Sequence, residues 1–259
     1  MNARKHAIAF IVLLLVSGCS TVLQASVADS YHIPTYGTIR DSITVILRDD
    51  FEDPTLNLNW YKFNNPGYDG SMERSTLDSY SGVACMNITS PAAPWQKTEA
   101  SRRYIPYPNH LKVGFEFRFK IPYLTKFGSI DFFLVYFNDT VEREAGFELI
   151  NYYDDGNLYI TYLQPEVNGV GHYVSTGKFL YVYSNTWYHV KAIADLNKCE
   201  YVSVQVNDLY VDLRGTPINI FSHSEPEEFW VAVACMPESG AYENKTILID
   251  NVFVTNESP

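Results

Sequence analysis

After its N-terminal segment, the chain is a succession of short runs rich in Val, Ile, Phe and Tyr, each closed by a cluster of turn residues. These clusters include NPGYDG, SPAAPW, DDGN, EVNGVG, DLNKCE and MPESG. Gly, Pro, Asn and Asp interrupt strands, so each cluster separates one strand from the next. Parallel pairing would require long crossover helices, and no helix of ordinary length is expected. The sequence therefore predicts an all-β chain that folds as a two-sheet antiparallel β-sandwich.

Three of these runs alternate between apolar and polar residues, and the alternation assigns each side chain to a face. In KVGFEFRFK the residues predicted to face the core are Val113, Phe115, Phe117 and Phe119. In YVSVQVND they are Val202, Val204 and Val206, which leaves Tyr201, Ser203 and Gln205 on the other face. In EFWVAVACM they are Phe229, Val231 and Val233, which leaves Trp230 outside among small neighbours.

Composition and charge narrow the choice of partners. Aromatic residues make up 15% of the chain and charged residues 19%, which suits half-buried pleated surfaces. The formal net charge is -11, and no cluster of Lys and Arg follows the first few residues. Such a surface repels phosphate backbones and anionic lipids, so nucleic acid is not an expected partner.

The N-terminus carries the pattern of an export signal. Arg4 and Lys5 precede the apolar run AIAFIVLLLVSG, which is short for a membrane span but suits a signal peptide over residues 1–28. Val16 to Cys19 resembles a lipobox, which would acylate Cys19, whereas Ser26-Val27-Ala28 offers an ordinary cleavage site that would remove Cys19 with the leader. We therefore expect a secreted or cell-surface protein, with a spacer over 29–42 and one β-sandwich domain over 43–256. The membrane would be a partner only through that lipid anchor.

Other short motifs leave alternatives open. Four Asn-X-Ser/Thr triplets would accept glycans in a host with that machinery, and they begin at Asn87, Asn138, Asn244 and Asn256. If Cys19 is acylated or removed, three cysteines remain, and at most one bridge can form among Cys85, Cys199 and Cys235. No CxxC pair is present, so a zinc site or a redox dithiol is not expected.

Five segments, taken in order, resemble the concanavalin A-like lectin/glucanase superfamily. They are LRDDFEDPTLNLNW, YSGVACMNI, HLKVGFEFRFKIP, NTWYHVKAIADLNKCEYVSVQVNDLYV and ILIDNVFV, which together span about residues 45 to 255. The resemblance implies a jelly-roll sandwich with a curved sheet that can hold a sugar chain. It also implies that Trp60 and Trp187 pack inside. It does not settle activity, because this architecture carries enzymes, lectins and passive spacers.

The glucanases of this superfamily carry E-x-D-x-E on one strand, and AGFELINYYDDGN lies where that strand is expected. Reading alternate positions gives Glu148, Ile150 and Tyr152, so the second and third acids are missing. A single carboxylate supplies no acid and nucleophile pair for retaining hydrolysis, so we expect no catalytic residues of this type. Lyases of the superfamily use R-x-E-x-R, and TEASRRYIPY keeps a Glu and two Arg at another spacing. A hydrolase or a lyase therefore remains the alternative.

For a carbohydrate-binding face, we expect aromatic rings that stack on sugars and polar groups that meet their hydroxyls. Trp230 is the leading candidate, because its parity places it away from the core; it could instead cover a hydrophobic patch. The companion candidates are Tyr152, Tyr136, Glu148 and Gln205. The predicted partner is a polysaccharide or another glycan, and a structural or adhesive surface protein is the third hypothesis.

The resemblance also implies a structural calcium ion. The related glucanases hold one near the first strand, the second strand's Gly and the closing strand's Asp, and these positions correspond to Asp50, Glu52, Gly82 and Asp250. Hard oxygen ligands suit Ca²⁺. The alternative is that Asp250 only accepts backbone hydrogen bonds.

Overall fold

The computed structural model describes residues 44–54, 60–103, 111–138, 140–152, 155–167, 170–222, 227–238 and 241–257. The signal peptide, the spacer and Cys19 lie outside these residues, so the expectations about export and lipidation stay predictions. Within the described ranges, no helix has the length and apolar character needed to cross a membrane.

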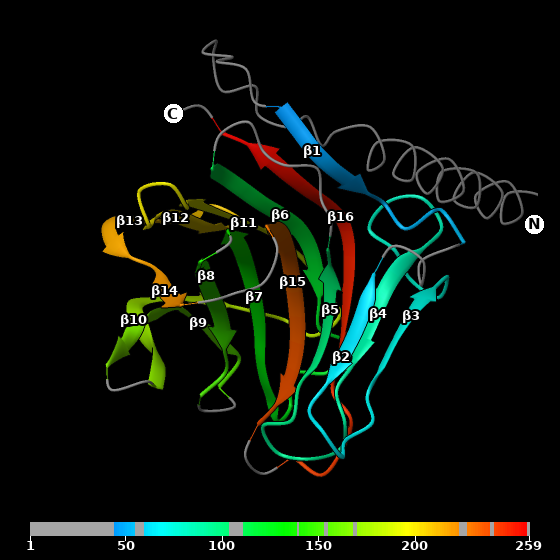
Figure 1. Cartoon of the computed structure of the whole chain (residues 1–259). Coiled ribbons are helices and arrows are strands. Elements are labelled where there is room, and N and C mark those ends of the chain that lie inside the picture. Colours follow the sequence, from blue (N-terminus) through cyan, green and yellow to red (C-terminus); the bar gives the residue numbers. More distant parts are fainter. Residues whose placement is uncertain are drawn as a thin grey trace, which may run out of the picture. The chain divides into compact units, whose positions relative to one another are not determined.

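The described chain forms two eight-stranded sheets (Figure 1). Sheet A has the order β13-β12-β11-β6-β16-β4-β3, with β1 also paired to β16. Its strands are β1 (Thr44–Asp49), β3 (Ser71–Ser75), β4 (Cys85–Thr89), β6 (Lys112–Lys120), β11 (Trp187–Asp195), β12 (Glu200–Val206), β13 (Leu209–Pro217) and β16 (Thr246–Asn256).

Sheet B has the order β10-β9-β8-β7-β15-β5-β2, with β14 also paired to β8. Its strands are β2 (Tyr61–Asn64), β5 (Thr98–Arg102), β7 (Phe127–Asn138), β8 (Val141–Ile150), β9 (Asn157–Val167), β10 (Val170–Tyr181), β14 (Asn219–Ser222) and β15 (Glu228–Pro237). Every strand pairing in both sheets is antiparallel. The predicted antiparallel sandwich is confirmed.

Aromatic side chains from both sheets fill the space between them. Phe117 of β6 meets Phe132 of β7 edge to face at 5.5 Å between ring centroids, and Phe132 stacks on Phe147 of β8 at 5.3 Å. Phe147 in turn meets Tyr201 of β12 at 5.0 Å. The alternation of KVGFEFRFK and EFWVAVACM is confirmed, since their predicted core residues are buried in this cluster.

The predicted faces of β12 are wrong at its start. Tyr201 is fully buried in the core, and Val202 is only half-buried on the other side. In the pairing with β11, the consecutive residues Ile193 and Ala194 oppose Ser203 and Tyr201, so this bulge inserts one residue and reverses the side-chain direction before Val204. Strict alternation cannot reveal the bulge, because it is defined by the pairing with the neighbouring strand β11.

The tryptophans and cysteines also differ in part from expectation. Trp60 is buried and donates a hydrogen bond from Nε1 to Asp49 at 2.8 Å, as the resemblance implied. Trp187 instead pairs with Lys120, outside the core, and its ring lies 6.1 Å from that of Tyr80. Cys85 and Cys235 are buried free thiols and Cys199 is a half-buried one, so the one allowed bridge does not form in the described chain.

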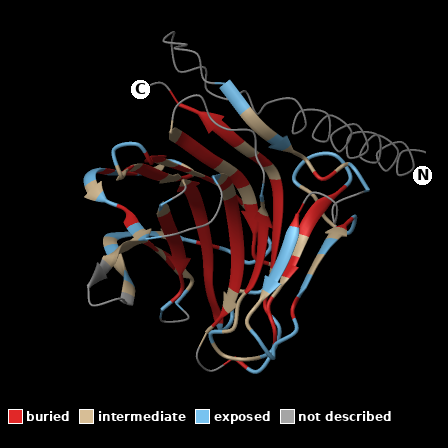
Figure 2. Ribbon diagram, in the orientation of Figure 1, coloured by how far each residue is buried: buried red, intermediate tan, exposed pale blue. Residues whose placement is uncertain are grey.

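The central strands of sheet B are buried along most of their length (Figure 2). All but the last residue of β7 are buried, although only alternate residues can face the core. Residues of β7 that point away from the core are therefore shielded from solvent as well. A buried sheet face that carries polar groups is the natural place to look for a site.

Candidate functional site

One row of residues crosses the outer face of sheet B through six neighbouring strands. From strand to strand, the cross-strand partners are Glu99 of β5, Ala234 of β15, Asp131 of β7, Glu148 of β8, Thr161 of β9 and Ser175 of β10. Directly opposed residues share a face, with Cβ atoms about 4.5–5.5 Å apart. We call these six residues the central row. It brings three carboxyl groups together although they are far apart in sequence.

Asp131 and Glu148 are the buried pair at the middle of the central row. The Ser129 hydroxyl donates to Asp131 Oδ1 at 2.7 Å, and the Thr161 hydroxyl donates to Glu148 Oε2 at 2.8 Å. Burial raises the pKa of both carboxyls, and the charge of Asp131 raises the pKa of Glu148 further. The titrations of two such close acids are coupled, so the pair retains its second proton up to neutral pH.

The expectation that Glu148 has no carboxylate partner is therefore wrong. Its partner comes from the neighbouring strand rather than from the same strand, as an E-x-D-x-E pattern would require. Asp131 lies in the apolar run FGSIDFFLVYF, where only strand pairing shows its relation to Glu148. The sequence carried no signal for that register.

Glu144 is a further acid on this face, two alternate positions before Glu148 on β8. Burial and the neighbouring Glu142 raise its pKa to about 7. Gly146 lies between Glu144 and Glu148, and a Cβ there would come within 3.0 Å of the Phe133 ring. Reading the alternation backwards from Glu148 gives Gly146, Glu144 and Glu142, so this signal was present in the sequence and was missed.

Lys97 and Tyr173 are the more exposed groups around the acid pair. Lys97 Nζ lies 2.9 Å from Glu99 Oε2 and 5.2 Å from the centroid of the Phe133 ring. Burial lowers the pKa of Lys97, but Glu99 outweighs burial and the net shift is upward. Tyr173 is the cross-strand partner of Leu163, which lies one alternate position after Thr161 on β9. Burial raises its pKa, and so do the charges of Asp131 and Glu148.

Trp230 lies on the outer face of sheet B, as its parity predicted. It packs against a small cluster separate from the main core, formed by Phe133, Val135, Phe137 and Ala232. Its ring stacks near Phe137 with centroids 6.3 Å apart, and the Arg103 guanidinium lies 5.7 Å from its centroid. Trp230 is half-buried, so part of the ring covers the cluster and part faces outward.

The other predicted binding residues are dispersed. Tyr136 faces the core and donates its hydroxyl hydrogen to Glu227 at 2.7 Å, so its predicted place on the binding face is wrong. Gln205 belongs to sheet A and donates to the Asn207 carbonyl at 2.7 Å, so it too lies away from the central row. Tyr152 follows β8, is exposed, and contacts Tyr159 of β9 with ring centroids 5.8 Å apart.

Within the described residues, the segment that echoed the lyase pattern forms β5 and continues to Arg103. Glu99 belongs to the central row, and Arg103 contacts Trp230, so both lie on the outer face of sheet B. Arg102 occupies the opposite parity and its pKa is lowered by burial. The basic groups near Glu99 are thus Lys97 and Arg103, spaced on either side of it.

The predicted calcium ligands hold a loop through hydrogen bonds. Asp250 Oδ2 accepts the N–H groups of Tyr80 and Ser81 at 2.8 and 2.9 Å, and its Oδ1 accepts that of Asn251 at 2.7 Å. Glu52 Oε1 accepts the N–H groups of Val83 and Ala84 at 2.8 and 3.0 Å. Oxygens that face N–H donors do not form the oxygen cage that Ca²⁺ requires. This geometry fits the alternative reading of Asp250, and calcium binding stays a prediction.

The remaining two calcium candidates complete this loop. Asp50 Oδ1 accepts the N–H of Glu52 at 3.4 Å. Gly82 has φ of +66°, and a Cβ there would lie 2.2 Å from Glu52 Oε1. The glycine therefore lets the loop approach the Glu52 carboxylate closely enough for the N–H bonds that follow it.

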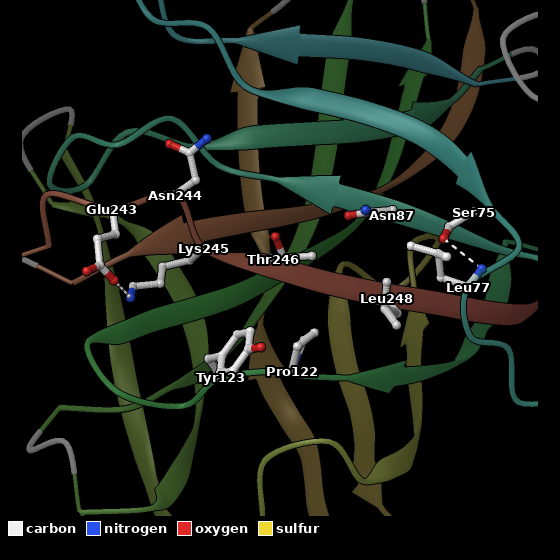
Figure 3. Close-up of a pocket in the computed structure, with 10 residues that line it drawn as sticks. All are labelled: Ser75, Leu77, Asn87, Pro122, Tyr123, Glu243, Asn244, Lys245, Thr246 and Leu248. Carbon is white, nitrogen blue, oxygen red and sulfur yellow. Dashed lines mark hydrogen bonds and ion pairs between the residues drawn. The ribbon is translucent and has the colours of Figure 1, made fainter.

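A pocket of about 290 Å³ opens on the outer face of sheet A, between β3, β4 and β16 (Figure 3). Leu77 and Tyr123 contribute apolar surface, and Lys245 pairs with Glu243 at 3.3 Å. Asn87 and Asn244, which begin two of the glycosylation triplets, both line it. By contrast, Asn256 is buried, which disfavours it as an acceptor.

Comparison with known proteins addresses the fold. No protein-family model matches the sequence, and no curated protein matches it. Among solved structures, an endo-β-1,4-glucuronan lyase from the fungus Trichoderma reesei superposes with a TM-score of 0.57 at 12% identity, covering 83% of this chain and 96% of the lyase. Two others have TM-scores of 0.49.

The first of these two is a family 16 endo-glucanase from Bacteroides ovatus, at 9% identity over 80% of this chain and 99% of the glucanase. The second is the carbohydrate recognition domain of Emp47p, at 12% identity over 86% of this chain and 100% of that domain. At this identity the likeness to the lyase concerns the fold alone, and it agrees with the predicted two-sheet antiparallel jelly-roll sandwich.

Proposed function

We propose that the protein is an exported, surface-associated carbohydrate-binding protein that holds a polysaccharide on the outer face of sheet B. The central row carries the proposal, because it aligns the carboxyl and hydroxyl groups of Glu99, Asp131, Glu148 and Thr161 on the face that also carries the half-buried ring of Trp230, two alternate positions along β15 from Ala234. Polar groups of this kind meet sugar hydroxyls, and aromatic rings stack on sugar C–H faces. The lyase that shares the fold acts on a polysaccharide, which supports this ligand class.

A polysaccharide pull-down with a matched pair of variants tests the binding site. Trp230→Ala removes a ring from the proposed face, whereas Trp187→Ala removes a ring of similar burial from sheet A. We expect a panel of neutral and charged polysaccharides to include at least one that binds the wild type and the Trp187 variant but not the Trp230 variant. Silence across the panel, or equal loss in both variants, would reject the site.

The Asp131–Glu148 pair favours a second candidate function, cleavage of the bound polysaccharide. One protonated and one ionised carboxyl at neutral pH is the state that general acid–base chemistry uses. In hydrolysis, one carboxyl would protonate the leaving glycosidic oxygen while the other acts at the sugar carbon or on water. Tyr173 and Lys97 lie close enough to influence the charge of the pair.

Product analysis separates cleavage from binding. Hydrolysis and elimination both release reducing ends, and only elimination from a uronic acid also creates an absorbing double bond. We expect Asp131→Asn and Glu148→Gln to abolish either signal while polysaccharide binding persists. Glu116→Gln is the control, because Glu116 is a partly buried carboxylate on sheet A that pairs with His189 at 2.8 Å. Absence of both products with every bound polysaccharide leaves binding as the function.

Surface display is the third element of the proposal and rests on the N-terminal sequence. The expected anchor is an acylated Cys19, and stable attachment would need more than one acyl chain. Cys19→Ser should move the protein from the membrane fraction to the soluble exported fraction, and incorporation of labelled fatty acid should stop. An unchanged distribution would favour cleavage near Ala28 instead.

A further inference from the structure

Five aromatic side chains gather where β8 ends, β9 begins and β10 ends. They are Tyr152, Tyr159, Phe179, Tyr181 and Tyr183, and we call them the aromatic platform. Ring centroids of Tyr152 and Tyr159 lie 5.8 Å apart, those of Tyr159 and Phe179 lie 5.5 Å apart, and those of Tyr181 and Tyr183 lie 5.1 Å apart. The rings thus form two contacting groups, one of Tyr152, Tyr159 and Phe179 and the other of Tyr181 and Tyr183. Phe179 and Tyr181 link the two groups, because they occupy alternate positions of β10.

These rings are not buried as core residues. Tyr152, Phe179, Tyr181 and Tyr183 are 44%, 53%, 56% and 63% exposed, and Tyr159 is half-buried between its neighbours. Isolated exposed aromatic residues need no explanation, but a contiguous group of rings at the surface is typical of a binding site. A rigid ring also loses little conformational entropy when a ligand stacks on it.

The aromatic platform continues the proposed polysaccharide site. Phe179 is the cross-strand partner of Tyr159, and Tyr159 is one alternate position from Thr161 of the central row. Parity therefore places Tyr159 and Phe179 on the outer face of sheet B, beside the acid pair. A chain that lies along this face over the central row reaches these rings next.

The chemistry of the platform favours a sugar polymer over a protein segment. Its members are rings, four of which carry a phenolic hydroxyl, and the adjoining exposed residue Ser175 adds an aliphatic hydroxyl. Tyr159 packs between Tyr152 and Phe179 and directs its hydroxyl toward Asp155 Oδ2 at 3.3 Å, so the more exposed rings of Phe179, Tyr181 and Tyr183 offer the contact surface. Pyranose C–H faces match such rings.

We propose that the aromatic platform is an extended subsite for successive pyranose rings, so that the protein recognises long chains rather than single sugars or chain ends. This inference rests on the proposed polysaccharide function and specifies its ligand class. Affinity is expected to rise with chain length, because each additional ring that stacks contributes about a threefold to tenfold gain. Short oligosaccharides would occupy the central row alone.

The test measures affinity by calorimetry for short and long oligosaccharides prepared from the polysaccharide that binds in the pull-down panel. We expect Phe179→Ala and Tyr181→Ala to reduce the affinity for long oligosaccharides by about threefold to tenfold each, and to leave that for disaccharides and trisaccharides unchanged. Tyr210→Ala is the matched control, since Tyr210 is 53% exposed on β13 of sheet A. Both target rings are exposed, so the variants should fold normally.

Each outcome separates the inference from the function on which it rests. Binding that depends on Trp230 but has equal affinity for short and long oligosaccharides would overturn the extended subsite and retain the polysaccharide site. An equal loss in the Tyr210 variant would overturn it as well. If no polysaccharide binds the wild type, the proposed function and the subsite fail together.

Discussion

The Tyr201 hydroxyl of β12 crosses the sandwich and binds the backbone of Gly146 on β8. It donates toward the carbonyls of Leu163 and Gly146 at 2.7 and 3.0 Å, and it accepts the Gly146 N–H at 3.1 Å. The β8–β9 ladder ends at Phe147 and Tyr162, so the hydroxyl stands where the next ladder bond would form. A side chain of sheet A thus fixes the strand that carries Glu148.

Replacing Tyr201 by Phe should destabilise the fold by about 1–3 kcal/mol, because a buried N–H and its neighbouring carbonyls lose their partner. For a domain of this size, each kcal/mol lowers Tm by about 2–4 °C. Thermal unfolding followed by circular dichroism measures the change. Tyr210→Phe is the control, since that ring is exposed and should leave Tm unchanged; equal Tm values for both variants would contradict the cross-sheet role.

The stability of the protein should fall as pH rises through the neutral range, because the folded pKa values of Glu148 and Asp131 lie above their unfolded values. The folded state then holds protons that the unfolded state releases, and this advantage is lost as the raised pKa is passed. Glu148→Gln should flatten the decline between about pH 4.5 and about pH 7, an effect of about 1–3 kcal/mol.

Glu116→Gln should change the pH dependence of stability in the opposite direction. Burial raises the pKa of Glu116, but the hydrogen bond from His189 and its charge outweigh burial, and the net shift is downward. Its stabilising contribution is therefore present at neutral pH and lost as pH falls. Denaturant titrations at several pH values compare the two variants, and parallel curves for both would show that the Glu148 environment is ordinary.

Asp250→Asn should destabilise the loop that contains Tyr80 and Ser81, because a neutral amide accepts fewer and weaker hydrogen bonds from its N–H groups. We expect a loss of about 1–3 kcal/mol in the free energy of unfolding. The same experiment with added CaCl₂ or EDTA tests the ion. A rise in wild-type Tm with calcium that the variant lacks would show that Asp250 binds Ca²⁺ rather than only N–H groups.

Gly82→Ala should destabilise the protein more than Gly215→Ala does. Both glycines have positive φ, which costs a residue with a side chain about 1–2 kcal/mol. A Cβ at Gly82 would also collide with Glu52 Oε1 at 2.2 Å, whereas Gly215 has open space around it. The difference in Tm between the variants isolates the contact with Glu52, and equal losses would mean that backbone strain alone matters.

Much of the fold was readable from alternation. The periodicity of KVGFEFRFK and EFWVAVACM gave the correct faces for Phe117 and Trp230, because burial on one face imposes a period of two. The same reasoning failed at Tyr201, where a bulge against β11 changes the parity. It failed for Tyr136 because both faces of β7 are buried, so hydrophobicity no longer distinguishes them.

The candidate site was only partly accessible to such reasoning. Glu148 was identified and Glu144 could have been, since they share one strand and one parity. Asp131 and Glu99 could not, because their proximity depends on which strands are neighbours in sheet B. Lys97 likewise gains its role from Glu99 and Phe133, two residues that only the tertiary fold brings together.

The two buried thiols lie in different sheets, so the opening of each sheet can be followed separately. Burial raises the pKa of Cys85 in β4 and of Cys235 in β15 to about 12, so both remain protonated and unreactive in the folded protein. Alkylation at either position would occur only when its own sheet opens. Mass spectrometry of alkylated peptides would therefore compare the rate at which sheet A opens with the rate at which sheet B opens, without any engineered probe.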